Sequence, residues 1–392
     1  MVTATMLGLL STKDFIVHLN AEMLYQHSHE FGPNAMKAEE NSFSVLIECE
    51  NDEYVKNALE MPQFVEGLER ARTVIFYRCK PVTKACVASA LRLGSRKVLA
   101  VGDGANDTQL LRAADVGVGV VSEDGSSNFE SCDFAVPSFR HICRLILIHG
   151  HHSLHRSVMA VHYSFYKALL FAGCQAIYQF WTDFSGNHFF GPFSLVTYNN
   201  LWTLIPMFAI IFDKDISDNF LFQLSFLYKK VSNKLTLTGG NLTWYFVAIY
   251  QSSVCMAIAY LMTGEYFTQT SEGKDLGKDF LALLVYFSLI FIITFYQLYN
   301  LSTITYYSLI AIFGNILLMV SISAIAQTGI EIPGLDISDW VGFYGEVFSS
   351  ANCILIMLTI ILAACTPSWL CLSFWTHFNA TDQLLVIEKE TI

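Results

Sequence analysis

The distribution of apolar residues constrains the fold of this chain more than any other feature. Six stretches are long enough to cross the hydrocarbon core of a bilayer, which takes roughly 20 apolar residues in a helix. They lie at about 157–180, 193–212, 242–263, 280–298, 302–326 and 343–365. Before residue 156, charged and turn residues recur regularly instead. The sequence therefore predicts a soluble segment followed by a bundle of six transmembrane helices.

Composition agrees with a membrane protein and excludes some functions. Of the 392 residues, 53% are hydrophobic and 15% are charged, which is unusual for a soluble protein. The net charge of −11, with no clustered basic face, argues against a nucleic-acid partner. The ten cysteines include no Cys-x-x-Cys pair, so we expect reduced thiols.

Basic residues predict the orientation of the six helices. They precede the first apolar stretch and fill the loop after the second, at Arg140, Arg144, Arg156, Lys214, Lys229, Lys230 and Lys234. Lys and Arg concentrate in cytoplasmic loops, and an even number of helices places both ends of the chain on one side. We therefore expect residues 1–156 and the tail at 366–392 to face the cytoplasm.

The soluble segment has the pattern of an α/β domain. Short β-prone runs at 73–77 and 97–101 flank a helical pattern at 82–93, which predicts a β-α-β unit. Such units form parallel sheets. Further strands of the same sheet and an intervening helix are predicted at 116–120, 134–136 and 108–114.

The loop after the second of these strands has the composition of a ligand site. It reads Gly102-Asp103-Gly104-Ala105-Asn106-Asp107, and ligands of parallel sheets bind at the carboxyl ends of strands. Carboxylates at Asp103 and Asp107 can hold Mg²⁺ through oxygen ligands, the glycines allow a tight turn, and Asn106 can donate to a phosphate. The alternative is an ordinary turn, because Gly, Asp and Asn are common turn formers.

Three runs in the soluble segment carry a resemblance to a known family. VLAVGDGANDTQLLRAADVGVGV at 98–120 closely resembles the hinge of the P-type ATPase phosphorylation domain, which has a haloacid-dehalogenase-like fold. ARTVIFYRCKPVTKA at 71–85 resembles the phospholipid-flippase branch of that family. SCDFAV at 131–136, with the following Phe-Arg and Ile-His-Gly, resembles the flippase stretch that leads to the membrane stalk.

The resemblance implies domains, cofactors and site residues. Residues 1–139 correspond to part of a phosphorylation domain and 140–156 to a stalk. A Lys can neutralise charge on a transferring phosphoryl group, and an Arg can reach nucleotide phosphates. The implied residues are Lys84 and Asp103 for catalysis, Arg78, Lys84, Asn106 and Asp107 for nucleotide or phosphate, and Asp103 and Asp107 for Mg²⁺. The implied cofactors are Mg²⁺ and ATP, and the alternative for the two basic residues is a solvated strand end and helix end.

Lys167 lies about ten residues into the first predicted membrane helix, where a charge costs roughly 2.5–3.5 kcal/mol. Its surroundings, Tyr163–Lys167, resemble the flippase fifth span, and the second stretch, with Tyr198, Thr203 and Pro206, resembles the sixth. The resemblance implies that Lys167, Asn199 and Asn200 line the lipid path. The alternative is that a helix carbonyl anchors Lys167.

Acidic residues distinguish a lipid from an ion as the transported substrate. A cation pump needs carboxylates inside its spans, yet 157–180 and 193–212 contain no Asp or Glu. The resemblance therefore implies an ATP-driven phospholipid translocase, and a cation-transporting P-type ATPase is the less favoured alternative. The implied partners are the membrane, a phospholipid and, in this family, a small two-span accessory glycoprotein subunit.

A second candidate site is formed by histidines near the predicted stalk. His149, His151, His152 and His155 have spacings that place imidazoles on one helical face, as zinc ligands require. No acid or cysteine in that segment completes a ligand set. The sequence therefore favours a polar stalk helix over a metal site.

The phosphorylated residue of the family is missing from this sequence. P-type pumps phosphorylate an Asp in an Asp-Lys-Thr-Gly sequence, which this chain does not contain. Residues 3–10 resemble the stretch just after the nucleotide-contact motif, so we expect the nucleotide domain, the actuator and four spans to be missing too. The chain alone should not turn over ATP. It is a truncated reading frame, half of a split pump, or an inactive paralogue acting as a membrane binding module, and its intact Lys84, Asp103, Asn106 and Asp107 favour an active parent.

Overall fold

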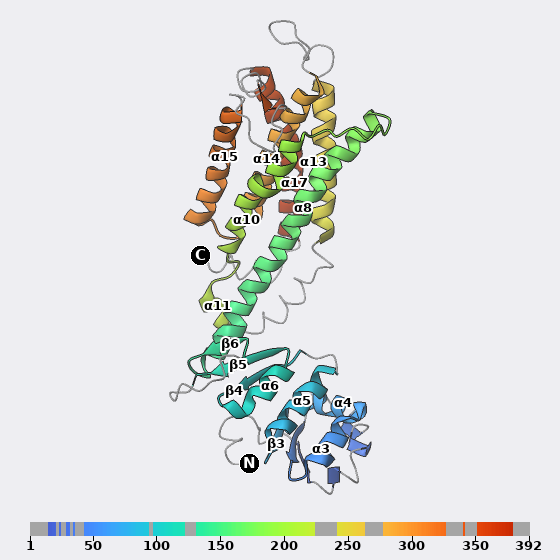
Figure 1. Ribbon diagram of the computed structural model, residues 1–392, viewed down its shortest axis with the longest axis vertical. Coiled ribbons are helices and arrows are strands. Elements are labelled where there is room, and N and C mark those ends of the chain that lie inside the picture. Colours follow the sequence, from blue (N-terminus) through green and yellow to red (C-terminus); the bar gives the residue numbers. More distant parts are fainter. Residues whose placement is uncertain are drawn as a thin grey trace. The chain divides into compact units, whose positions relative to one another are not determined.

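A computed structural model describes residues 15–20, 23–24, 29–31, 34–35, 43–93, 97–121, 131–223, 241–262, 277–326, 340–341 and 351–378. The chain forms two compact units, Met1–Cys143 and Arg144–Ile392. The first unit contains parallel sheets and short helices, and the second is helical (Figure 1). A parallel-sheet domain and a helical bundle are thus confirmed. The predicted resemblance at residues 3–10 lies outside the described residues.

Three parallel strands form the first sheet of the amino-terminal unit. They are β1 (Phe15–Leu19), β2 (Phe43–Glu48) and β3 (Thr73–Tyr77), paired in that order. The central strand β2 is almost entirely buried, as its run of apolar residues requires. Two short helices, α3 (Asp52–Leu59) and α4 (Pro62–Arg70), add Val55 and Phe64 to the core on this sheet.

Three further parallel strands form a second sheet. They are β4 (Leu99–Gly102), β5 (Val116–Val120) and β6 (Phe134–Val136), again paired in chain order. The predicted strand at 97–101 begins two residues later than expected. The reason is that the Val98 N–H donates to the Asp115 carboxylate, at 2.9 Å, instead of joining a strand ladder.

The single predicted sheet is corrected to two sheets. The predicted β-α-β unit is present in sequence order, because α5 (Pro81–Leu93) connects β3 to β4. However, β3 pairs with β2, and β4 pairs with β5. Within the described residues the two halves of the unit are joined by helices, since α5 packs against α6 (Thr108–Ala113). Apolar periodicity indicates where strands lie, but it does not specify which strands become neighbours.

Long helices make up the described part of the carboxyl-terminal unit (Figure 1). They are α8 (His151–Trp181), α13 (Asn241–Met262), α14 (Lys278–Asn300), α15 (Tyr306–Ala326) and α17 (Ala351–Phe378). The second predicted membrane stretch is instead broken into α9 (Pro192–Thr197), the π-helical turn η4 (Tyr198–Trp202) and α10 (Leu204–Ile211). A π-helical turn η3 (Leu145–Gly150) precedes α8, and α11 (Asp218–Gln223) follows α10.

Five helical segments of the described residues are long and apolar enough to cross a membrane, judged by length and composition. They are Pro192–Ile211, Leu242–Leu261, Lys278–Asn300, Tyr306–Ile325 and Ala351–Cys371. Together with the comparisons below, they support a multi-pass membrane protein. Residues 343–350 of the last predicted stretch lie outside the described residues, and α17 continues beyond residue 365.

The first predicted membrane helix is not among those five. The structure places an unbroken helix of 31 residues there, α8. Polar residues such as His162, Lys167 and Gln175 lower its mean hydropathy, although they lie in a segment of the expected length. A sixth transmembrane helix therefore stays a prediction.

The core of the bundle lies around α14, which is buried along most of its length. α13 packs against α8 and α17, and α14 packs against α17. The α8–α13 contact is close because Gly173 has no side chain. A Cβ at Gly173 would lie 2.5 Å from the Ser252 hydroxyl oxygen, so a larger residue would push these two helices apart.

Candidate functional site

The predicted phosphate loop contains an ion pair between Lys84 and Asp107. Lys84 comes from the first turns of α5, and Asp107 ends the 3-10 turn η1 (Ala105–Asp107) that follows β4. The Lys84 Nζ atom lies 2.9 Å from Asp107 Oδ1. The Asp107 side chain is 12% exposed and that of Lys84 is 42% exposed. An ammonium and a carboxylate therefore meet where the sequence predicts phosphate and Mg²⁺.

Gly102 makes this position of Asp107 possible. A Cβ added at Gly102 would lie 2.5 Å from the Cβ of Asp107, closer than real Cβ contacts come. The same addition at Gly104 meets nothing within 4 Å. Gly102 therefore allows Asp107 to pack closely against the end of β4. Gly104 is not required for close packing.

The other predicted loop residues face solvent. Asp103 and Asn106 are both exposed, whereas Asp107 is buried. Carboxylate and amide oxygens with open surroundings can reach an ion or a phosphate that approaches from solution. The loop thus offers one carboxylate held by Lys84, at Asp107, and one exposed carboxylate, at Asp103.

Arg78 does not take part in the Lys84–Asp107 ion pair and has acidic partners of its own. Its guanidinium pairs with Glu48 at 3.2 Å and with Glu50 at 2.8 Å. Its backbone has a φ of +59°, a left-handed conformation that costs a residue with a Cβ roughly 1–2 kcal/mol. To bind a nucleotide phosphate as predicted, Arg78 would have to release these two acidic partners.

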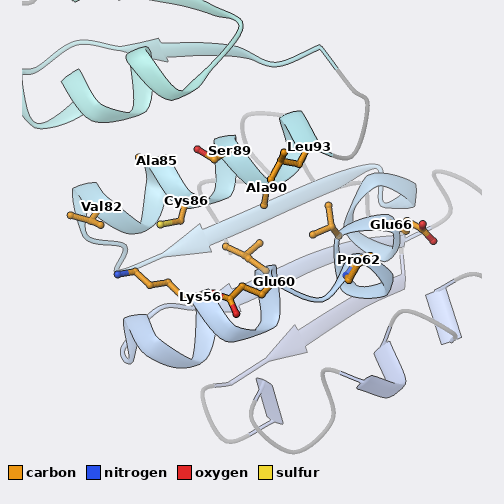
Figure 2. Close-up of a pocket in the computed structure, with 12 residues that line it drawn as sticks. Lys56, Glu60, Pro62, Glu66, Val82, Ala85, Cys86, Ser89, Ala90 and Leu93 are labelled. Carbon is orange, nitrogen blue, oxygen red and sulfur yellow. The ribbon is translucent and has the colours of Figure 1, made fainter.

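The same unit contains a groove with different chemistry. Its volume is about 880 Å³, and its lining includes neither Lys84 nor Asp107. Val82, Cys86 and Leu93 of α5 line it together with Lys56 of α3 and Glu60, the residue that follows α3 (Figure 2). The apolar face of α5 thus lines this groove, whereas Lys84 of the same helix contacts Asp107 of the phosphate loop.

In the carboxyl-terminal unit, Lys167 is bound to the broken helix. Its Nζ atom donates to the Thr203 hydroxyl at 2.8 Å, and that hydroxyl donates in turn to the Tyr198 carbonyl at 2.8 Å. The Tyr198 hydroxyl donates to the Lys167 carbonyl at 2.6 Å. Asn199 and Asn200 are exposed. Within the described residues, the ammonium therefore contacts a hydroxyl of the second predicted span and not the two predicted amides.

The break beside Lys167 has a local cause. Pro206 lacks the N–H that would bond to the carbonyl four residues earlier, and η4 departs from α-helical geometry over the preceding turn. The Thr203 carbonyl accepts a hydrogen bond from the Tyr163 hydroxyl of α8, at 2.9 Å. Side chains from a neighbouring helix thus satisfy backbone groups that an unbroken helix would satisfy itself.

Comparison with known proteins decides the family. A profile described as "Phospholipid-translocating P-type ATPase C-terminal" matches residues 129–381. The chain belongs to this family. Phospholipid-transporting ATPase 10 of Arabidopsis thaliana is 29% identical over 72% of this chain and 24% of its own length. Phospholipid-transporting ATPase VD of Macaca fascicularis is 31% identical over 65% of this chain and 38% of its own length.

This phospholipid-translocating ATPase segment spans about a quarter of the length of the Arabidopsis relatives that it matches. The share is 24% for the first Arabidopsis protein and 26% for a second, probable phospholipid-transporting ATPase 12. The range matched by the family profile includes α8 with Lys167 and begins after the loop that contains Asp103 and Asp107. The family assignment therefore rests mainly on the membrane half.

The histidine cluster of this ATPase segment differs from the sequence expectation. Three of the four histidines, His151, His152 and His155, are buried, whereas His149 is exposed. The acids that the stalk segment lacks come from beyond α10: His151 Nε2 lies 2.8 Å from Asp215 Oδ2, and His155 Nε2 lies 3.3 Å from Asp213 Oδ2. The sequence argument that no acid completes the cluster is thus corrected.

The electrostatics of this cluster keep its acids ionised. Burial alone would raise the pKa of Asp215, but the hydrogen bond from His151 and the nearby imidazole of His152 outweigh burial and hold that pKa well below its ordinary value. Burial likewise disfavours the charged form of His155, yet the Asp213 hydrogen bond and the Asp215 charge raise its pKa. Sequence reasoning missed Asp213 and Asp215 as partners of the histidines, because they lie some 60 residues further along the chain. The one local signal was that the two acids alternate with Lys214.

Proposed function

We propose that this chain is part of an ATP-driven translocase that moves phospholipid between the two leaflets of a membrane. Membership of the phospholipid-translocating family supports the substrate class. The observation that carries the proposal is the Lys167–Thr203 hydrogen bond, at 2.8 Å, between α8 and the broken second span. The hydroxyl of Thr203 carries no negative charge that would neutralise the ammonium of Lys167, so the ammonium can attract a lipid phosphate.

The neighbouring helix break supports passage of a head group. Pro206 and the π-helical turn η4 weaken the backbone ladder of the second span. Asn199 and Asn200 lie on the exposed side of that turn, where their amides can contact a head group while the acyl tails stay in lipid. Lys167, Asn199 and Asn200 thus remain the proposed lipid path, with Thr203 added as the residue that holds Lys167.

A lipid-binding measurement on the 392-residue chain tests this proposal. A short-chain phospholipid is titrated into the detergent-solubilised protein, and binding is followed by calorimetry. Because a charge-assisted hydrogen bond contributes about 1.5–3 kcal/mol, we expect Lys167→Ala to weaken binding by roughly tenfold or more. Lys278→Ala, which removes an ammonium paired with Asp279 at the start of α14, is the matched control and should bind normally. Equal binding by both variants would make Lys167 a structural anchor.

The amino-terminal unit supports the ATP-driven part of the proposal. We propose that Asp103 and Asp107 hold Mg²⁺, and that Lys84 and Asn106 contact the transferring phosphoryl group in a haloacid-dehalogenase-like phosphorylation domain. The 2.9 Å ion pair between Lys84 and Asp107 supports this assignment, because a cationic side chain beside the metal ligand stabilises charge on the phosphoryl oxygens. Mg²⁺ and ATP are accordingly the proposed cofactors.

The proposed orientation places residues 1–156 and the tail at 366–392 in the cytoplasm, from the basic loops and the even number of predicted spans. A glycosylation acceptor engineered into the tail tests this orientation, because glycans are added on the opposite side. Glycosylation of the tail would contradict it. A phospholipid substrate is favoured over a cation because α8, α13, α15 and α17 contain no Asp or Glu.

A further inference from the structure

Three buried side chains converge where α8 begins. The donor atoms of His151, His152 and Asp215 all lie within 4.8 Å of one another. Their exposed fractions are 2%, 5% and 8%. Histidine nitrogens and carboxylate oxygens are the ligands that Zn²⁺ uses in proteins. Two elements distant in sequence, the base of α8 and the segment after α10, thus supply one compact set of metal-binding atoms.

The partner of His152 Nε2 indicates which nitrogen of this ring can bind a metal ion. His152 Nε2 lies 3.3 Å from Asp218 Oδ1, a carboxylate that can only accept, so Nε2 carries the proton. In the neutral ring, Nδ1 then carries a lone pair. A carboxylate partner for the far nitrogen is the arrangement found around metal-bound histidines, because it fixes the tautomer that can bind the ion.

In that neutral tautomer, the Nδ1 lone pair of His152 faces another electron-rich atom. His152 Nδ1 lies 3.6 Å from Asp215 Oδ1, which is too far for a hydrogen bond, and it has no hydrogen-bond partner among the described residues. A buried acceptor without a donor is costly. A cation between Nδ1 and the Asp215 carboxylate would satisfy both groups, whereas the hydrogen bonds of the cluster leave this one atom unsatisfied.

The distances fit a zinc ion after a small adjustment. Two ligands at about 2.0–2.1 Å from a tetrahedral ion lie about 3.3 Å apart. Asp215 Oδ1 lies 3.0 Å from His151 Nε2 and 3.6 Å from His152 Nδ1. These two distances lie on either side of the required separation, within about 0.3 Å.

We propose that His151 Nε2, His152 Nδ1 and the Asp215 carboxylate bind a Zn²⁺ ion, with water at the fourth position. Binding releases the Nε2 proton of His151 to solvent and replaces its hydrogen bond to Asp215 by two metal–ligand bonds. His155, held by Asp213 at 3.3 Å, borders the site. The site is separate from the Mg²⁺ ligands proposed in the phosphate loop, and it ties α8 to the segment that follows the broken second span.

Titration of the 392-residue chain with Co²⁺, followed by competition with Zn²⁺, tests this site. Co²⁺ reports tetrahedral nitrogen and oxygen ligands by visible absorption. We expect one equivalent to bind, Zn²⁺ to abolish the signal, and Zn²⁺ to raise the thermal unfolding temperature of the protein. His152→Ala and Asp215→Asn should weaken Co²⁺ binding by at least tenfold, and Asp218→Asn by roughly 10–100-fold because it loses the partner of His152 Nε2.

His149→Ala is the matched control, since it removes an exposed histidine two residues from the cluster. It should bind one equivalent of Co²⁺ with unchanged affinity. Size-exclusion chromatography and circular dichroism identify any variant that does not fold. If His152→Ala or Asp215→Asn does not fold, Asp218→Asn replaces it in the comparison, because the Asp218 carboxylate is more exposed than the other side chains of the cluster. The site would be overturned if the wild-type chain bound no Co²⁺, or if His152→Ala bound it as tightly as His149→Ala.

Discussion

The side-chain amide of Asn315 on α15 donates a hydrogen bond to the main-chain carbonyl of Trp202, with 3.0 Å between Nδ2 and O. Trp202 lies four residues before Pro206, and proline has no N–H with which to satisfy that carbonyl. A residue 113 positions away in the chain therefore stabilises the break in the second span. This contact explains how a proline is tolerated in the interior of a membrane protein.

The first prediction concerns this contact. Asn315→Leu should destabilise the protein by about 1 kcal/mol, the scale of interhelical hydrogen bonds in membranes, because the Trp202 carbonyl loses its donor. Thermal unfolding in detergent measures the change. Asn300→Leu is the control, since the Asn300 amide donates to the Tyr296 carbonyl of its own helix. An equal or larger effect of Asn300→Leu would contradict the assigned role of Asn315.

The second prediction uses the two glycines of the phosphate loop. Gly102→Ala places a Cβ 2.5 Å from the Cβ of Asp107, so it should displace Asp107 and destabilise the amino-terminal unit by about 1–3 kcal/mol. Gly104→Ala, at a position with nothing within 4 Å, should change stability by less than about 0.5 kcal/mol. Thermal unfolding of both variants is the measurement. Similar stabilities would show that Asp107 does not depend on close approach to β4.

The third prediction concerns Mg²⁺. In the complete translocase, Asp103→Asn combined with Asp107→Asn should abolish Mg²⁺-dependent phosphoenzyme formation from ATP, because both proposed metal ligands lose their charge. Glu66→Gln removes an exposed carboxylate from α4 of the same unit and should leave the reaction unchanged. Phosphoenzyme is measured with radiolabelled ATP. Normal phosphorylation of the double variant would remove the Mg²⁺ assignment.

The fourth prediction concerns pH and Cys49. Burial, followed by the contact with the Cys79 sulfur 2.7 Å away, raises the pKa of the Cys49 thiol far above its ordinary value of 9.0. Only the thiolate is alkylated, so iodoacetamide at pH 8 should modify the exposed Cys143 much faster than Cys49. Mass spectrometry of timed samples measures both rates.

The same shift predicts a loss of stability at high pH. The unfolded chain releases the Cys49 proton near pH 9, whereas the folded protein retains it. The stability of the folded protein is therefore fully present below pH 9 and decreases as the pH rises above 9. The free energy of unfolding should decrease by up to about 1.4 kcal/mol per pH unit above that value, and Cys49→Ala should flatten the dependence. Equal alkylation of Cys49 and Cys143 in the folded protein would contradict the raised pKa.

Much of the local structure could be predicted from the sequence. The strand at 73–77, the helix at 82–93 and three of the long apolar helices, α13, α14 and α15, lie within a few residues of the predicted bounds. These features follow from apolar periodicity and from Pro and Gly at their ends, which act within one segment. The single sheet was wrong, because strand pairing depends on neighbours that periodicity does not name.

Local residue patterns were enough to identify each segment: a strand before the Gly-Asp-Gly loop, apolar helices, and a costly Lys167 inside one of them. The partners of the side chains were set by the packing of distant segments. Lys84 meets Asp107 across 23 residues, Lys167 meets Thr203 across 36, and His151 meets Asp215 across 64. The physical reason is that periodicity records which face of a segment is buried, whereas a hydrogen bond needs two particular atoms within about 3 Å. That proximity is set by how helices from distant parts of the chain pack together.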